Sequence, residues 1–158
     1  MGAAEIIKKT VPDMTLHAST QMTVTSLEGV KYLEDMGFSR VVLARELSEK
    51  EIEHICKNAK AEIEVFVHGA ICMCYSGQCL MSSILGGRSG NRGRCAQPCR
   101  LPYDLLENGK TVKSGYVLSP KDMALVNDLG TLKHIGVTSL KIEGRLKRAE
   151  YVSAVVGA

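Results

Sequence analysis

The chain has 158 residues, with 20 basic and 17 acidic side chains, and its formal net charge of +3 excludes a polycation. This length and a hydrophobic content of 45% fit one ordinary globular domain. No apolar run approaches the roughly twenty residues of a membrane-spanning helix, and the N-terminus lacks the pattern of a signal peptide. We therefore expect a cytoplasmic protein with no membrane partner, in which clustered cysteines act as metal ligands or redox groups rather than as structural disulfides.

Strand-like and helix-like segments alternate in the first half of the chain. Apolar residues recur on one helical face at Leu27, Val30 and Leu33. Ser48, with Glu51 three residues later, has the pattern of a capping box. These patterns predict helices over residues 3–9, 26–36 and 48–59, and strands over 14–18, 40–44 and 62–67. Strands that alternate with helices in this way are typical of a parallel sheet.

The alternation is interrupted in the second half. Asn108 and Gly109 suit the positive φ angles of a tight turn, so residues 103–106 and 110–113 are predicted to form an antiparallel hairpin. Ser119, with Pro120 after it, has the pattern of a helix start. The other predicted elements are a strand at 116–118, a helix over 119–129, a strand over 138–142 and a helix over 149–156.

The predicted fold class is α/β, in which the strands form part of a TIM-like (β/α) barrel that carries a Cys-rich insertion and a β-hairpin. A closed barrel needs eight strands and about 250 residues, which is more than this sequence supplies. We therefore expect residues 1–158 to be a single domain that is a fragment of a longer barrel protein. Exposed edge strands of such a fragment favour a homodimer or a larger assembly.

Residues 68–103 form a segment rich in cysteine, glycine and arginine, and we expect it to bind a metal. Four of its cysteines follow the spacing C-x6-C-x15-C-x3-C, namely Cys72, Cys79, Cys95 and Cys99. Four soft thiolates in one loop are typical of a zinc or iron-sulfur site. Zinc sites usually use closer cysteine pairs than Cys72 and Cys79, so the spacing favours iron-sulfur. We interpret Cys74 as a spare thiol that could substitute for Cys72, and Cys56 as a core residue.

Several stretches of the chain resemble a known family. The run from Glu64 to Cys72 with Gly77–Ser82 after it, the run Gly86–Tyr103 and the run Ser139–Arg145 are similar to peptidase family U32, also called the collagenase-like proteases. The resemblance covers nearly the whole chain. Known members of the family are longer than 158 residues, which supports the fragment interpretation.

The resemblance implies a function that differs from the family's name. The better understood members are iron-sulfur proteins that hydroxylate RNA bases, in transfer RNA or 23S ribosomal RNA, or that take part in oxygen-independent ubiquinone hydroxylation. The resemblance is greatest to the ribosomal RNA cytidine branch. In these members four cysteines hold a 4Fe-4S cluster, and the matching positions here are Cys72, Cys79, Cys95 and Cys99. Zinc is the alternative metal, or a replacement for a lost cluster.

Arginines are the second feature of the Cys-rich segment. No carboxylate occurs between Val65 and Tyr103, whereas this stretch contains four arginines, namely Arg88, Arg92, Arg94 and Arg100. Guanidinium groups among glycines are suited to phosphate contacts, so we expect RNA as a partner. The same arginines could instead offset the charge of a cluster or solvate a loop. Few stacking platforms for bases are expected, because only Tyr75 and Tyr103 lie near.

Catalytic candidates follow from the barrel interpretation, because the active sites of such barrels lie at the C-terminal ends of the strands. We predict four catalytic residues there: His17, His68, Glu143 and Arg145. Three further polar residues would face the same mouth: Gln21, Arg45 and Glu46. His68 could carry a proton or only form a structural hydrogen bond, and Glu143 could simply pair with Arg145.

Three functions are compatible with the sequence. We predict an iron-sulfur-dependent RNA base hydroxylase, of which residues 1–158 alone could be inactive. The first alternative is a peptidase. The sequence has no H-E-x-x-H motif of a zinc protease and no G-x-S-x-G motif of a serine hydrolase. Only Ser82 or Ser83 with His68 would make a speculative catalytic dyad. The second alternative is a four-cysteine metal module that binds RNA or a protein partner without turnover.

Overall fold

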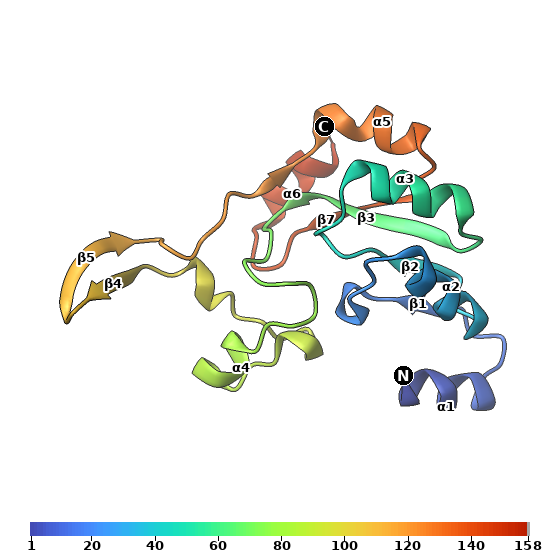
Figure 1. The fold of residues 1–158 in the computed structure, drawn as a ribbon, viewed down its shortest axis with the longest axis horizontal. Helices are drawn as coiled ribbons and strands as arrows, with labels where there is room; N and C mark the ends of the chain where they lie inside the picture. The colour runs from blue at the N-terminus through green and yellow to red at the C-terminus, as the bar shows by residue number, and fades with distance from the viewer. Residues whose placement is uncertain (158) are drawn as a thin grey trace.

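The computed structural model describes residues 1–157. Its helices are α1 (Gly2–Thr10), α2 (Leu27–Asp35), α3 (Glu49–Asn58), α4 (Met81–Gly86), α5 (Leu129–His134) and α6 (Ala149–Val156). Its strands are β1 (His17–Ala18), β2 (Arg40–Val42), β3 (Glu62–Gly69), β4 (Tyr103–Glu107), β5 (Lys110–Gly115), β6 (Met123–Ala124) and β7 (Ser139–Glu143). Figure 1 shows a body of sheet and helices from which the β4–β5 hairpin projects to one side. Within these residues, no helix has the length and apolar character that crossing a membrane requires.

Strand β3 is the centre of the larger sheet. The strand order is β1-β2-β3-β6, and β7 also pairs with β3. Strands β1, β2, β3 and β7 are parallel, whereas β6 runs antiparallel to β3. The predicted α/β class is therefore confirmed, but the sheet formed by residues 1–157 is open and does not close into a barrel.

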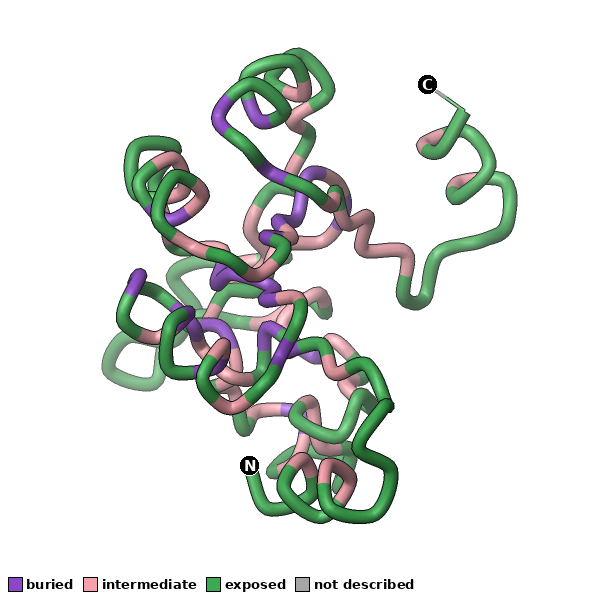
Figure 2. The backbone as a smooth tube through the Cα atoms, turned by 90° about the vertical axis from the view of Figure 1, so that its right-hand side faces the viewer, coloured by how far each residue is buried: buried purple, intermediate pink, exposed green. Residues whose placement is uncertain are grey.

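Alternate residues of β3 face opposite sides of the sheet. Ile63, Val65 and Val67 are buried in a core that they share with side chains of α2, α3 and the region around α5. Burial of one such side chain contributes roughly 1.5–3 kcal/mol relative to exposure, so this face joins the sheet to its helices. Figure 2 shows that buried residues concentrate in this body, while α6 is largely exposed. The opposite face of β3 carries Glu64 and Phe66, and this face borders the candidate site.

Local signals define the two helices that pack on the sheet. The Ser26 side chain accepts a hydrogen bond from the Gly29 amide at the start of α2. The predicted capping box of α3 is present, with the Glu51 carboxylate accepting a hydrogen bond from the Ser48 amide (2.7 Å). Such caps satisfy amides of the first helical turn that have no partner within the helix. The helices predicted over 3–9, 26–36 and 48–59 are thus confirmed, with each end shifted by one residue.

The β4–β5 hairpin is confirmed, whereas one predicted strand is shorter than expected and another is wrong. Asn108 and Gly109 both adopt positive φ angles (49° and 76°), as the two-residue turn requires. The first strand covers only His17–Ala18 instead of 14–18. Residues 116–118 form a turn rather than a strand.

The prediction of a helix over 119–129 is also wrong. The Ser119 hydroxyl does not cap a helix, because it accepts a hydrogen bond from the Arg100 guanidinium (2.9 Å), which also donates to the Pro120 carbonyl (2.6 Å). The chain stays extended, and Met123–Ala124 pairs with β3 before α5 begins. A contact between residues distant in sequence therefore overrides a local helix signal.

We predict that Gly69→Ala destabilises the sheet. Gly69 has a φ of +106°, and a Cβ at this position would overlap the Glu143 carbonyl group where β3 pairs with β7. The strain and the overlap should lower the free energy of unfolding by at least about 2 kcal/mol, measured by urea denaturation. Gly86→Ala is the matched control, because no atom lies within 4 Å of its Cβ position. Equal stability of the two variants would contradict the close β3–β7 approach.

Candidate functional site

The face of the sheet opposite the core carries a ladder of charged residues across three strands. Glu64 of β3 accepts hydrogen bonds from Lys141 (3.0 Å) and Ser139 (2.9 Å) of β7, and it lies 3.5 Å from Arg40 of β2. Burial alone would raise the pKa of Glu64, but these hydrogen bonds and the charges of Lys141 and Arg40 more than offset it and hold the pKa below its ordinary value. Lys141 is thereby fixed in the wall of the neighbouring pocket.

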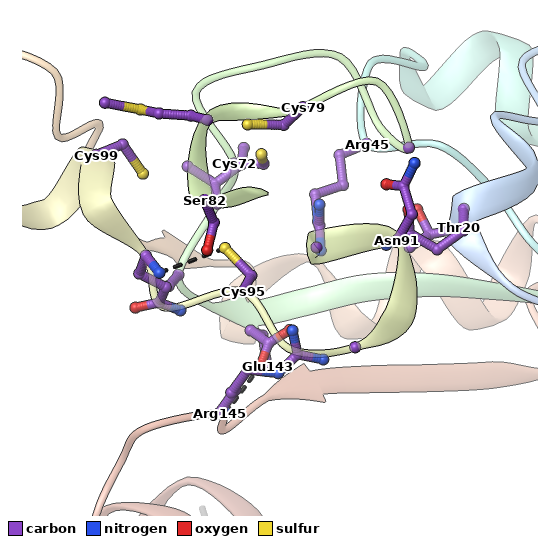
Figure 3. Close-up of a pocket in the computed structure, with 18 of the residues that line it drawn as sticks. Thr20, Arg45, Cys72, Cys79, Ser82, Asn91, Cys95, Cys99, Glu143 and Arg145 are labelled. Atoms are coloured by element: carbon purple, nitrogen blue, oxygen red, sulfur yellow. Dashed lines mark hydrogen bonds between the residues drawn. The ribbon is translucent and has the colours of Figure 1, made fainter. Parts of the chain in front are cut away.

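A pocket of about 410 Å³ lies beyond the C-terminal ends of the parallel strands. Its lining includes all four cysteines predicted as metal ligands, namely Cys72, Cys79, Cys95 and Cys99. Figure 3 shows the four thiols on one side of the pocket, with Arg45, Thr20 and Asn91 on the other side and Glu143 with Arg145 below. The fold therefore brings cysteines that are up to 27 positions apart in the sequence to one cavity.

The thiols lie close enough to influence one another's protonation. Burial raises the pKa of the Cys99 thiol, and the thiols of Cys72, Cys95 and Cys79 raise it further. Burial and the thiols of Cys79 and Cys72 likewise raise the pKa of Cys74, which does not line the pocket. Within residues 1–157, no three Cys, His, Asp or Glu side chains converge as the ligands of a single metal ion do. The four thiols form one wall of the pocket (Figure 3).

The loop between the first two of these cysteines is anchored by Ser76, which is 1% exposed. The Glu46 carboxylate accepts hydrogen bonds from the Ser76 amide (2.9 Å) and hydroxyl (3.3 Å), and the hydroxyl accepts one from the Arg45 amide (3.3 Å). The Thr23 hydroxyl donates to the Ser76 carbonyl (2.7 Å), and Gly77 (φ +74°) leaves no room for a Cβ beside Thr23. Glu46 therefore fixes the loop to the sheet and does not line the pocket.

The segment that carries the last two cysteines is anchored by Arg100. Its guanidinium donates hydrogen bonds to the carbonyls of Pro120 (2.6 Å) and Ile71 (2.9 Å) and to the Ser119 hydroxyl (2.9 Å), and it forms an ion pair with Asp122 (3.1 Å). Ile71 and Arg100 are the sequence neighbours of the first and the last of the four cysteines, so one side chain ties both ends of the cysteine set together. With 20% of its side chain exposed, Arg100 is less available to RNA than the sequence predicts.

Hydrogen bonds to helix α4 and within the turn at Gln97 hold the segment that carries Cys95. Ser82 of α4 is buried, and its hydroxyl accepts a hydrogen bond from the Ala96 amide (3.0 Å). Gln97, which has a positive φ of 56°, donates its amide hydrogen bond to the Cys95 sulfur (3.3 Å). Sequence analysis misses α4 because six residues in a glycine-rich stretch give no clear periodicity.

The structure brings two of the four predicted catalytic residues into the pocket. Glu143 and Arg145 both line it, and Glu143 accepts a hydrogen bond from the Arg145 amide (2.8 Å) rather than from its guanidinium. His68 instead faces α6, where its ring centroid lies 5.9 Å from that of Tyr151. His17 is exposed at the start of β1, and neither histidine lines the pocket.

Among the pocket residues that sequence analysis misses are Thr20, Phe66, Asn91 and Lys141. Phe66 and Lys141 are partners across β3 and β7, and the alternation of β3 could have placed Phe66 on the face opposite the core. Arg45 stacks on the Phe66 ring, with its Cζ 4.0 Å from the ring centroid. No sequence signal points to Thr20 or Asn91, because their position depends on how two distant loops meet.

The three other predicted RNA-binding arginines are exposed: Arg88, Arg92 and Arg94. We call them the arginine rim. They do not line the pocket, but Gly90 and Gly93 of the same loop do, so the rim stands at the edge of the pocket. The Arg88 side chain donates a hydrogen bond to the Arg94 carbonyl (3.0 Å), which folds this loop on itself.

Comparison with known proteins identifies relatives along the whole chain. The family model of peptidase family U32 matches residues 1–158. A 23S rRNA 5-hydroxycytidine synthase of Escherichia coli is 46% identical, over 95% of this chain and 23% of the relative. A tRNA hydroxylation protein of Bacillus subtilis is 39% identical, over 96% of this chain and 38% of the relative.

A relative that is named for proteolysis rather than for RNA hydroxylation is also similar to the chain. A collagenase of Porphyromonas gingivalis is 34% identical, over 89% of this chain and 37% of the relative. The chain thus spans between 23% and 38% of the lengths of these three relatives. No solved structure matches it significantly.

We predict that Arg100→Lys weakens the fold around the thiols. An ammonium group cannot replace the planar fork that contacts Ile71, Ser119 and Pro120 together, so the free energy of unfolding should fall by about 2–3 kcal/mol. Urea denaturation measures the change. Arg94→Lys is the control, because this exposed side chain should tolerate the change within about 0.5 kcal/mol. Equal stability of the two variants would exclude the anchoring role of Arg100.

Proposed function

The chain belongs to peptidase family U32, and from this membership together with the four-thiol pocket we propose that it is the cluster-binding part of an iron-sulfur-dependent RNA base hydroxylase. One observation carries the proposal: the four cysteines of the spaced set line one cavity beyond the ends of the parallel strands. Two relatives that are named for RNA hydroxylation support the reaction class. The chain spans a minor part of each relative, so the complete activity is proposed for the protein that contains this domain.

Four thiolates of this spacing suit a 4Fe-4S cluster, which we propose in preference to zinc. A four-cysteine zinc site usually uses two close pairs with about two to four residues between their members, whereas Cys72 and Cys79 have six residues between them. In a cluster each thiolate would bind a different iron, and all four cysteines line the same cavity. Cys72, Cys79, Cys95 and Cys99 would hold the cluster, which when bound supplies one-electron chemistry beside the pocket.

RNA is the proposed substrate. The arginine rim places three exposed guanidinium groups at the edge of the pocket, where they can contact phosphates without reading sequence. The pocket itself is large enough for a nucleoside, and pockets of small-molecule size usually span about 300–1,000 Å³. A backbone-binding rim next to a pocket fits an enzyme that takes one base out of its strand.

We also propose that the open sheet is part of a (β/α) barrel. The parallel order β1-β2-β3 with α2 and α3 as crossovers fits such a barrel, and β7 continues it on the side of β3 away from β2. Within residues 1–157, β1 pairs only with β2, and β7 only with β3. These two edges can accept further strands, or a second copy of the chain in a homodimer or larger assembly.

A peptidase is the second candidate function, favoured by the relative that is named a collagenase. The hydroxyl of Ser82 is buried and accepts a hydrogen bond from the Ala96 amide, while His68 faces α6. The dyad that the sequence allows between Ser82 and His68 is therefore not assembled. A metal module that binds RNA or a protein without turnover shares every feature of the pocket, and only a test for hydroxylated product separates it from the enzyme.

Substitution of the thiols tests which cysteines bind metal. We expect Cys72→Ser, Cys79→Ser, Cys95→Ser and Cys99→Ser each to lose most of the iron and sulfide after purification without oxygen, because a serine hydroxyl is a poor ligand for soft iron-sulfur sites. Iron content and the visible thiolate-to-iron absorbance report the loss. Cys56→Ser and Cys74→Ser should retain the metal, since neither residue lines the pocket. Retention of iron by Cys79→Ser, or its loss in Cys74→Ser, would refute this ligand set.

Removal of the rim charges tests the RNA proposal. We expect Arg92→Ala/Arg94→Ala to weaken binding of single-stranded RNA about tenfold and to reduce its salt dependence, because two phosphate contacts are lost. Fluorescence anisotropy at several salt concentrations measures both. The control Lys9→Ala/Lys31→Ala removes the same charge from exposed positions of α1 and α2. If both double variants bind RNA equally well, the arginine rim is not the RNA contact.

A further inference from the structure

The wall of the pocket opposite the thiols is built from three polar residues of three different loops. Thr20 follows β1, Arg45 follows β2, and Asn91 lies in the glycine-rich loop that carries the arginine rim. Figure 3 shows them together on the side of the pocket away from the labelled cysteines. We call these residues the polar wall.

The Arg45 guanidinium has N–H donors without an acceptor within residues 1–157. Its backbone amide is fixed by the hydrogen bond to Ser76, and one face of its guanidinium is covered by the Phe66 ring at 4.0 Å. Phe66 itself is 7% exposed and held in β3, so the guanidinium has a defined position. Within residues 1–157, no carbonyl or carboxylate accepts a hydrogen bond from this guanidinium. Its N–H edge is therefore available to a ligand in the pocket.

Thr20 is a second group without a partner. The residue is 8% exposed, and its hydroxyl oxygen is buried with no hydrogen-bond partner within residues 1–157. An unsatisfied buried hydroxyl costs about 1–3 kcal/mol, and a ligand that reaches this part of the wall would satisfy it. The structure thus shows two independent polar groups that lack partners in the same wall.

The chemistry of the wall calls for a ligand that accepts hydrogen bonds. Around it, Lys141 is paired with Glu64, and Glu143 accepts from the Arg145 amide, so the guanidinium groups of Arg45 and Arg145 are the charged pocket donors that have no acceptor within residues 1–157. A phosphate can accept hydrogen bonds from a guanidinium, a hydroxyl and an amide nitrogen as well, so the experiment below separates a phosphate contact from a base contact. The edge of a pyrimidine base offers a carbonyl oxygen and a ring nitrogen side by side, which suits a guanidinium, a hydroxyl and an amide together.

We propose that Thr20, Arg45 and Asn91 form a subsite that binds the O2/N3 edge of a flipped-out pyrimidine base. The assignment rests on the proposed RNA hydroxylase function and adds the substrate orientation. In a pyrimidine ring C5 lies opposite C2, so a base whose O2 is held by the polar wall directs C5 toward the thiols. The 46% identical relative is named for 5-hydroxycytidine synthesis, a reaction at this carbon.

The test compares two short oligoadenylates that differ at one central position, which is a cytidine in one and an abasic ribose in the other. The intact metal-loaded chain should bind the cytidine oligonucleotide about tenfold more tightly in fluorescence anisotropy, a difference that one buried base typically supplies. Arg45→Lys and Thr20→Val should bring this ratio close to one without changing affinity for the abasic oligonucleotide or the iron content. Thr20→Ser, which keeps the hydroxyl, should retain the preference.

Thermal unfolding separates this role from a structural one. Because Thr20→Val removes an unsatisfied buried hydroxyl and keeps the side-chain shape, the variant should melt at or above the wild-type temperature while it loses the base preference. Equal binding of the two oligonucleotides by the wild-type chain would overturn the subsite, even if the cluster is present. An equal loss of affinity for both oligonucleotides in Arg45→Lys would make Arg45 a phosphate contact and would also overturn it. A wild-type chain that prefers cytidine but binds no iron or sulfide would instead remove the hydroxylase proposal and leave the subsite.

Discussion

The pocket depends on two polar anchors that fasten an otherwise weakly structured segment to the sheet. Glycine-rich chain loses much conformational entropy on folding and has few apolar side chains to offset this loss. The Glu46 carboxylate fixes the first cysteine loop through Ser76, and the Arg100 guanidinium joins the chain before Cys72 to the chain after Cys99. Because these contacts are partly shielded from water, breaking one leaves donors or acceptors poorly satisfied and costs more than a surface hydrogen bond. The arrangement of the thiols is therefore a consequence of hydrogen bonding more than of apolar packing.

The sequence predicts local elements well and misses what depends on distant contacts. The capping box at Ser48 and the Asn108-Gly109 turn are local signals, and the structure confirms both. The helix predicted from Ser119 fails because Arg100, which is remote in sequence, holds that residue. The gathering of the cysteines follows from their spacing, but the polar groups that complete the pocket do not. Thr20 belongs to the site only because the loop after β1 meets the cysteine segment, which no periodicity reveals.

His68 shows why strand position alone is a poor guide to catalysis. The β3–β7 register shifts between Phe66 and His68, and such an irregularity re-aims the side chains that follow it. Phe66 lines the pocket, whereas His68 lies against Tyr151 of α6. The remaining side chains form one wall of thiols and one wall of polar groups. Such a pocket fits redox chemistry on a bound base, and it contains no assembled nucleophile and base of the kind that peptide hydrolysis requires.

The metal content of the chain purified without oxygen tests the central claim most directly. Iron, acid-labile sulfide and zinc are measured per chain on one preparation of the wild-type protein. The account predicts about four iron and four sulfide per chain, the composition of one 4Fe-4S cluster held by four cysteines. One zinc per chain without sulfide would contradict it, because the thiols would then serve a structural site with no redox role.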